Sequence, residues 1–119
     1  MKKDDHVESL KRLQHMLEAI AEIQKYIQAE SLTTFCQSGL IHNAVLYQFS
    51  VIGEAIIHVE DEKLDKYDYP WHKVRSFRNM IAHKYFNIKL IAVWTIIQND
   101  LPELKDIIEQ ILTNEFKNE

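Results

Sequence analysis

The chain has 119 residues, a formal net charge of −4 and one cysteine, which excludes an intramolecular disulfide and a thiolate zinc cluster. Its acidity argues against a broad, non-specific grip on nucleic acid, and we find no apolar run that approaches the roughly 20 residues of a membrane span. Two glycines, two prolines and 46% hydrophobic residues favour a single domain, residues 1–119, built from long helices around a core. No apolar signal core follows the first residues, so we expect a cytoplasmic protein.

Apolar residues at steps of three and four predict one amphipathic helix from about Asp4 to Glu30. The stripe consists of Val7, Leu10, Leu13, Leu17, Ile20, Ile23 and Ile27. A loop and a short helical turn are expected over residues 31–36, capped by Ser31 or Thr33. We expect Cys36 to be a small buried residue.

A second long helix is predicted from Ser38-Gly39 to about Val59. Its expected buried face comprises Ile41, Ala44, Val45, Gln48, Ile52, Ala55, Ile56 and Val59. Gly53 lies inside this helix and costs about 1 kcal/mol of helix propensity relative to alanine. Such a glycine usually permits close helix packing. The charge-dense segment 60–69 is typical of a solvated connection.

Pro70 suits the first turn of a third helix, predicted over residues 70–84. Asn87 can cap a fourth helix, and residues 99–102 (Asn-Asp-Leu-Pro) predict a break or a kink. The last amphipathic stripe contains Leu104, Ile107, Ile108, Ile111 and Leu112. We expect Trp71 and Trp94 to be core anchors. The elements together predict an all-α, up-and-down bundle of four or five helices with a short additional helix.

The segment 71–89 is the most basic part of the chain. It holds five Lys or Arg and no acidic residue, whereas the remaining chain has nine basic and 18 acidic residues. The basic residues are Lys73, Arg75, Arg78, Lys84 and Lys89. A local cationic patch on an anionic body indicates one site for a phosphate-bearing ligand.

The third predicted helix has two different faces on a helical wheel. Its core arc comprises Val74, Phe77, Met80 and Ile81. The opposite arc presents Arg75, Arg78, Asn79 and His83. An arginine can bind phosphate through two hydrogen bonds, and a histidine titrates near neutrality. These groups suit cleavage of RNA, which supplies its own 2′-OH nucleophile and needs no metal. One helix carries one such histidine, so a homodimer would supply a base and an acid.

Arg78 and His83, with four residues between them, resemble the R-x-x-x-x-H-x-Y signature of HEPN domains of the HepT type, which Lys84 and Tyr85 complete. Asn79 matches the commonest form of that motif. Other segments resemble the family in order and spacing, namely Ile52-Gly53-Glu54-Ala55, Tyr69-Pro70-Trp71, Val93-Trp94 and Asp100-Leu101-Pro102-Glu103-Leu104. One departure is that proline and tryptophan are adjacent here, where relatives often have a few residues between them.

The resemblance implies a HEPN-type homodimer that acts as a metal-independent endoribonuclease, the toxin of a toxin–antitoxin pair, without a cofactor of its own. The implied partner is an MntA-like nucleotidyltransferase antitoxin that uses ATP to transfer AMP to the motif tyrosine, Tyr85. If the roles of the family's motif residues apply here, Arg78 would bind the scissile phosphate, His83 would transfer protons and Asn79 would orient the site. Supporting or RNA-binding roles are assigned to Glu54, Arg75 and Lys84. Glu54 lies beside the apolar face and either hydrogen bonds toward the motif or remains solvated.

Two function classes stay open at this point. One is the ribonuclease; the other is a non-catalytic module whose basic face binds a nucleotide or docks the partner transferase. The complete Arg–Asn–His–Tyr set favours the enzyme. Neither His15 with Glu18 nor Glu54 with His58 has the Glu-x-x-His order of a di-iron bundle, so we expect no metal site. We also expect an RNA substrate, no DNA and no membrane.

Overall fold

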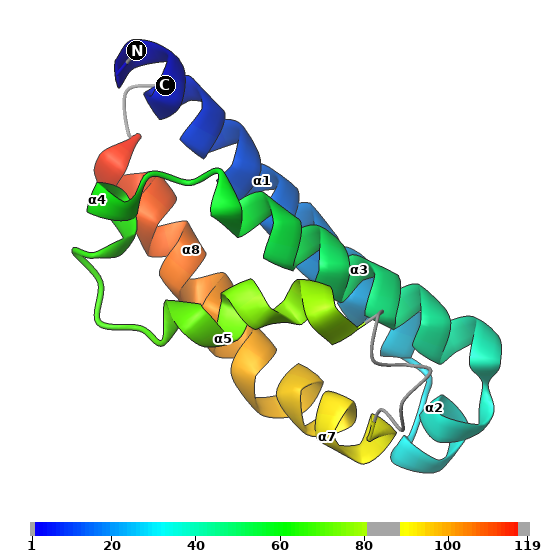
Figure 1. The fold of residues 1–119 in the computed structure, drawn as a ribbon. Helices are drawn as coiled ribbons and strands as arrows, with labels where there is room; N and C mark the ends of the chain where they lie inside the picture. The colour runs from blue at the N-terminus through cyan, green and yellow to red at the C-terminus, as the bar shows by residue number, and fades with distance from the viewer. Residues whose placement is uncertain (1, 81–88, 117–119) are drawn as a thin grey trace.

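The computed structural model describes residues 2–80 and 89–116, and within those ranges every regular element is helical. The predicted all-α class is therefore confirmed. The molecule is elongated, with principal extents of 45 × 27 × 23 Å. The start of α1 and the end of α8 lie at the same end of the bundle, where the rings of His6 and Phe116 are 4.5 Å apart (Figure 1).

Two long antiparallel helices, α1 (Lys2–Ile27) and α3 (Gly39–Ile57), lie side by side and form one half of the bundle (Figure 1). The short helix α2 (Leu32–Gln37) joins them. The other half is made of short elements and one long helix, which are α4 (Asp61–Leu64), α5 (Trp71–Arg75), the 3-10 turn η1 (Ser76–Arg78), α7 (Leu90–Thr95), the π-helical η2 (Ile96–Asp100) and α8 (Leu101–Glu115). Helix α8 packs against α1, α7 packs against α2, and α5 with η1 crosses α3.

Serine side chains start the two helices at the α1–α3 connection. The Ser31 hydroxyl accepts a hydrogen bond from the Thr34 N–H at 3.2 Å, and the Thr34 hydroxyl accepts one from the Ser31 N–H at 2.8 Å. Ser38 likewise accepts from the Ile41 N–H at 3.2 Å. Such caps satisfy N–H groups that have no partner inside the helix. Ser31 is therefore the cap, and Thr33 is not.

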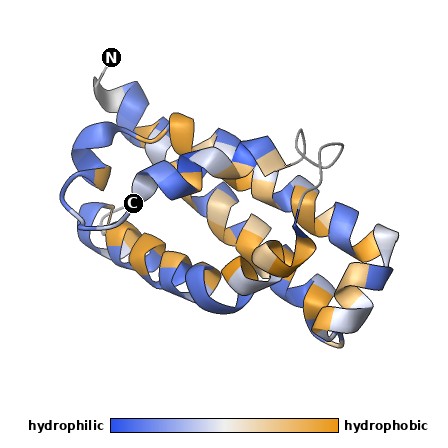
Figure 2. Cartoon of the chain, turned by 60° about the horizontal axis from the view of Figure 1, so that its bottom comes forward, coloured by the Kyte–Doolittle hydropathy of each residue, from blue (hydrophilic) through white to orange (hydrophobic). Residues whose placement is uncertain are grey.

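The buried faces follow the predicted periodicity, with shifts at their edges. Figure 2 shows hydrophobic and hydrophilic residues alternating along each long helix. In α3, the prediction missed Leu46 and Phe49, which are fully buried, whereas Gln48 is only half-buried. In α1, Val7 was predicted inside but is 42% exposed. The side chains with almost no exposure include Leu13, Met16, Ile20, Ile23, Phe35, Phe49, Ile52, Ile56, Leu101 and Leu104.

The charged segment after α3 is a solvated connection only in part. Residues 65–68 are largely exposed, as predicted, but residues 61–64 form the helix α4, whose Leu64 is fully buried and whose Lys63 is 7% exposed. Lys63 pairs with Glu60, and its ammonium lies 5.6 Å from the Phe116 ring centroid. The Trp71 indole N–H donates to the Leu64 carbonyl at 3.0 Å, so Trp71 is the predicted core anchor. The structure of this segment is therefore determined by apolar contacts such as the burial of Leu64, which its charged sequence does not indicate.

Three further predictions differ from the structure. Of the break or kink expected at residues 99–102, the break is wrong, because the π-helical η2 leads directly into α8 and Pro102 occupies its first turn. Proline has no N–H group to donate to the carbonyl four residues earlier, as a regular α-helix requires. The wider π-helical turn before it does without that hydrogen bond. Cys36 is partly exposed. Trp94 is half-buried, with its ring 5.2 Å from that of Phe35.

Helix α3 is long and apolar enough to cross a membrane by length and composition. The expectation that no segment approaches a membrane span was therefore wrong for this helix. In the structure, α3 is a central helix of the bundle and packs against α1, α2, α5 and η1. Core helices pass the same test of length and composition, so this is weak evidence for a membrane span.

Candidate functional site

The segment that carries the candidate arginine is less regular than the sequence predicts. Instead of one helix over residues 70–84, the chain forms α5, which ends at Arg75, and then the tighter η1. The Ser76 hydroxyl donates to the Lys73 carbonyl at 2.6 Å. A serine that bonds its own backbone in this way competes with regular α-helical geometry. The predicted core arc is nevertheless confirmed for Val74 and Phe77, which are buried.

Phe77 fixes this segment to the bundle. Its ring meets the Phe49 ring of α3 edge to face, with centroids 5.0 Å apart and planes at 80°. Next to it in the chain, Arg78 and Asn79 are exposed. One side of the segment is therefore held by the core while the other presents a guanidinium and an amide to solvent.

The backbone of Arg78 lies directly against α3 at Gly53. A Cβ atom built on Gly53 would be 2.4 Å from the Arg78 nitrogen, closer than real Cβ contacts. The glycine that interrupts helix propensity in α3 is therefore the point at which η1 crosses it. This bears out the expectation of close packing at Gly53 and identifies the neighbour.

The guanidinium of Arg78 pairs with Glu54, the residue after that glycine. The Nη1–Oε2 distance is 3.9 Å, and the side chains are 54% and 59% exposed. Glu54 also lies 3.7 Å from the Nε2 atom of His58. Exposed pairs of this kind contribute only about 0.2–1 kcal/mol. The contact with Glu54 is therefore weak, and most of the Arg78 guanidinium remains accessible to solvent.

A second arginine of the basic segment is also paired. Arg75 donates from Nη2 to the Asp61 carboxylate in α4 at 3.3 Å. Asp61 and Glu54 both come from outside the acid-free segment 71–89, so folding partly balances the cationic patch that the sequence predicts. The charge density of segment 60–69 gave no signal that Asp61 would face Arg75.

The remaining motif residues, His83, Lys84 and Tyr85, fall outside the described residues, as does the proposed cap Asn87. The structure thus brings together Arg78, Glu54 and Gly53, and places Asn79 beside them along the chain. Within the described ranges, no group of three or more His, Cys, Asp or Glu side chains could hold a metal ion.

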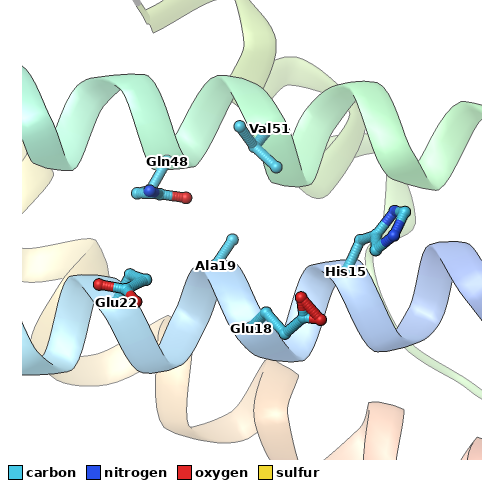
Figure 3. Close-up of a pocket in the computed structure, with 6 residues that line it drawn as sticks. All are labelled: His15, Glu18, Ala19, Glu22, Gln48 and Val51. Carbon is cyan, nitrogen blue, oxygen red and sulfur yellow. The ribbon is translucent and has the colours of Figure 1, made fainter.

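An open groove lies between α1 and α3 and reaches Glu54, the partner of Arg78. One hollow of about 260 Å³ is lined by residues that include Tyr47, Ser50 and Glu54. A second, of about 310 Å³, continues past His15, and Figure 3 shows its side chains reaching from both helices. The groove was not predicted, because its two walls are far apart in the sequence.

The region of the chain that contains this arginine is similar in sequence to known proteins. The model of the family described as ribonuclease HepT-like matches residues 16–111, which is most of the chain. The chain belongs to this family. The resemblance drawn from its motifs is therefore confirmed, and with it the HEPN-type helical bundle.

Several curated proteins resemble this HepT-like chain. A gamma-glutamylcyclotransferase and putative RNase of Methanocaldococcus jannaschii is 33% identical over 107 residues, which cover 89% of this chain and 48% of the relative. A putative RNase of the same organism is 29% identical, with 82% and 90% covered. A protein of Thermococcus cleftensis named probable ribonuclease HepT is 26% identical, with 83% and 91% covered.

The chain thus spans about half of the first of these relatives and most of the other two. No solved structure matches it.

Proposed function

We propose that this HepT-like chain is a metal-independent endoribonuclease and the toxin of a toxin–antitoxin pair, acting on RNA in the cytoplasm. Family membership supports the ribonuclease class. The exposed Arg78 connects the proposal to a particular residue. Its backbone packs against α3, and among the described residues its side chain pairs only with the Glu54 carboxylate, 3.9 Å away. A weakly paired guanidinium on a closely packed backbone is suited to bind a phosphodiester.

The proposed reaction uses the nucleophile that RNA provides. The 2′ oxygen attacks the adjacent phosphorus and gives up its proton to a base. The bond from phosphorus to the 5′ oxygen breaks, and that oxygen takes a proton from an acid. The products are a 2′,3′-cyclic phosphate and a 5′-hydroxyl. In this proposal Arg78 replaces its contact with Glu54 by contacts to the phosphate, His83 transfers protons and Asn79 orients the substrate. Arg75 and Lys84 add positive charge along the RNA backbone.

The test of this function is cleavage of RNA by the purified protein in EDTA, with His83→Ala beside the wild type. Removal of a proton-transfer group typically lowers a rate by about 10²–10⁴-fold, so the variant should be nearly inactive. Products should carry cyclic or hydrolysed phosphate at the 3′ end. Undiminished cleavage by His83→Ala would place the activity elsewhere. Binding of RNA without cleavage by the wild type would instead identify the non-catalytic nucleotide-binding or docking module.

We also propose a homodimer in which the two motif segments face each other near the two-fold axis, since each chain supplies one motif histidine and the reaction needs a base and an acid. The outward side of α3 supports a protein contact, because Leu40 is 85%, Tyr47 57% and Ile57 45% exposed. Tyr47 also lines the groove beside Glu54, so a second copy seated there would approach Arg78. Isologous pairing is the commonest form of dimer. Light scattering at micromolar concentration should give twice the chain mass of 14.1 kDa. A strictly monomeric mass would contradict the dimer.

The proposed partner is an MntA-like nucleotidyltransferase that transfers AMP from ATP to the Tyr85 hydroxyl. Each added AMP brings a phosphate with about one negative charge, which can pair with the arginines that would otherwise bind RNA. Tyr85→Phe retains the ring but lacks the acceptor oxygen. We expect it to gain no mass of AMP on co-expression with the partner and to remain toxic.

Mass spectrometry checks this prediction, with Tyr47→Phe as the matched control. Tyr47 is an exposed tyrosine on α3, outside the motif, so its variant should still be modified. AMP that persists on Tyr85→Phe, or that maps to another residue, would rule out this mode of regulation.

A further inference from the structure

We propose that Gly53 is a positioning residue that sets the location of Arg78 relative to α3. The proposal rests on the function proposed above, because it assigns Gly53 a role through the arginine of that site. Gly53 has no side chain that could touch a substrate. Its effect comes from the space that its missing side chain leaves for the backbone of η1.

The geometry of the crossing leaves no room for any other residue. A Cβ at Gly53 would lie 2.4 Å from the Arg78 nitrogen, 2.9 Å from its Cβ and 3.1 Å from its Cα. The nitrogen and Cα are backbone atoms, so a change of side-chain rotamer cannot relieve the overlap. Since an ordinary contact is at least 3.4 Å, η1 would have to move away from α3 by about 1 Å.

The neighbouring contacts determine what such a movement would change. Two contacts hold the residues just before Arg78: the Phe77 ring packs on Phe49, and Arg75 pairs with Asp61. These contacts keep the preceding part of the segment on the bundle, so the displacement falls on Arg78. The Arg78 guanidinium would then move away from Glu54, because Glu54 follows Gly53 directly in α3 and does not move with η1. Gly53 and Glu54 thus place the backbone and the guanidinium of the same arginine.

The chain contains a matched control, because its only other glycine is Gly39. Gly39 lies at the start of the same helix, and a Cβ there would meet only the Asn43 Nδ2 atom, at 4.0 Å. Gly39→Ala therefore makes the same chemical change in open space. It should leave cleavage unchanged, whereas a misplacement of about 1 Å in an active site can cost about 10²-fold in rate.

The experiment compares Gly53→Ala and Gly39→Ala, each alone and combined with Arg78→Ala. We expect Gly53→Ala to lower kcat by about 10²-fold with the helical circular dichroism signal retained. In the Arg78→Ala background, it should lower the residual rate by less than twofold, because a residue that acts only through Arg78 has nothing left to position. A purely structural role would give the same loss in both backgrounds.

Crystal structures of the two glycine variants provide a readout that needs no enzymatic activity. We expect Arg78 to shift by about 1 Å relative to α3 in Gly53→Ala and to stay in place in Gly39→Ala. If the wild type does not cleave RNA, the proposed function fails, and this shift still tests the positioning. An unchanged Arg78 would overturn the inference. So would loss of the helical signal in Gly53→Ala, since the glycine would then be needed by the bundle as a whole.

Discussion

Arg78→Ala is expected to lower the rate of RNA cleavage by about 10²–10³-fold, the typical cost of removing one donor that stabilises developing charge. Its stability should hardly change, because the Arg78 side chain is 54% exposed and its recorded partner, Glu54, is 3.9 Å away. Single-turnover cleavage and thermal unfolding, measured on the same preparations, separate the two effects. A variant that cleaves normally would show that this arginine is not the phosphate ligand.

Lys25→Ala is the matched control for this substitution. Lys25 is likewise exposed and loosely paired with a glutamate, Glu22, at 3.7 Å. The charge removed is the same, but Lys25 is outside the basic segment, so its loss should affect cleavage by less than about twofold. Arg78→Lys is the complementary variant. It retains the charge but loses the two-pronged donor geometry, and its activity should fall between those of the wild type and Arg78→Ala.

Phe77→Ala is expected to destabilise the protein by about 3–5 kcal/mol, the usual cost of truncating a buried phenylalanine. Phe77 is 4% exposed, and its ring packs edge to face on Phe49. For a chain of this length, such a loss lowers the midpoint of thermal unfolding by roughly 10–20 °C. Because Phe77 precedes Arg78, cleavage should also fall at temperatures at which the variant is still folded.

Ile91→Ala provides the comparison for that truncation. It also shortens a large hydrophobic side chain, but Ile91 is 64% exposed on α7. Surface substitutions usually change stability by no more than about 0.5 kcal/mol. A midpoint for Phe77→Ala within a few degrees of that of Ile91→Ala would show that the core does not hold η1 in place.

Local sequence was sufficient for the class of the fold and for the family. The three- and four-residue spacing of apolar side chains fixes which side of α1 and α8 faces inward, because a helix has 3.6 residues per turn. Ser31 and Ser38 could be placed at helix starts since a cap acts within three residues. The motif that begins at Arg78 identified the family because its residues are close together in the chain.

The tertiary structure decided the features that depend on residues far apart in the sequence. The pairing of Arg78 with Glu54 and the packing of its backbone on Gly53 join positions more than 20 residues apart. Helical spacing carries no information about which helix will cross another, or where. The burial of Leu64 within a charged segment has the same origin. In each case the free energy of packing against a distant element outweighed the local preference of the sequence.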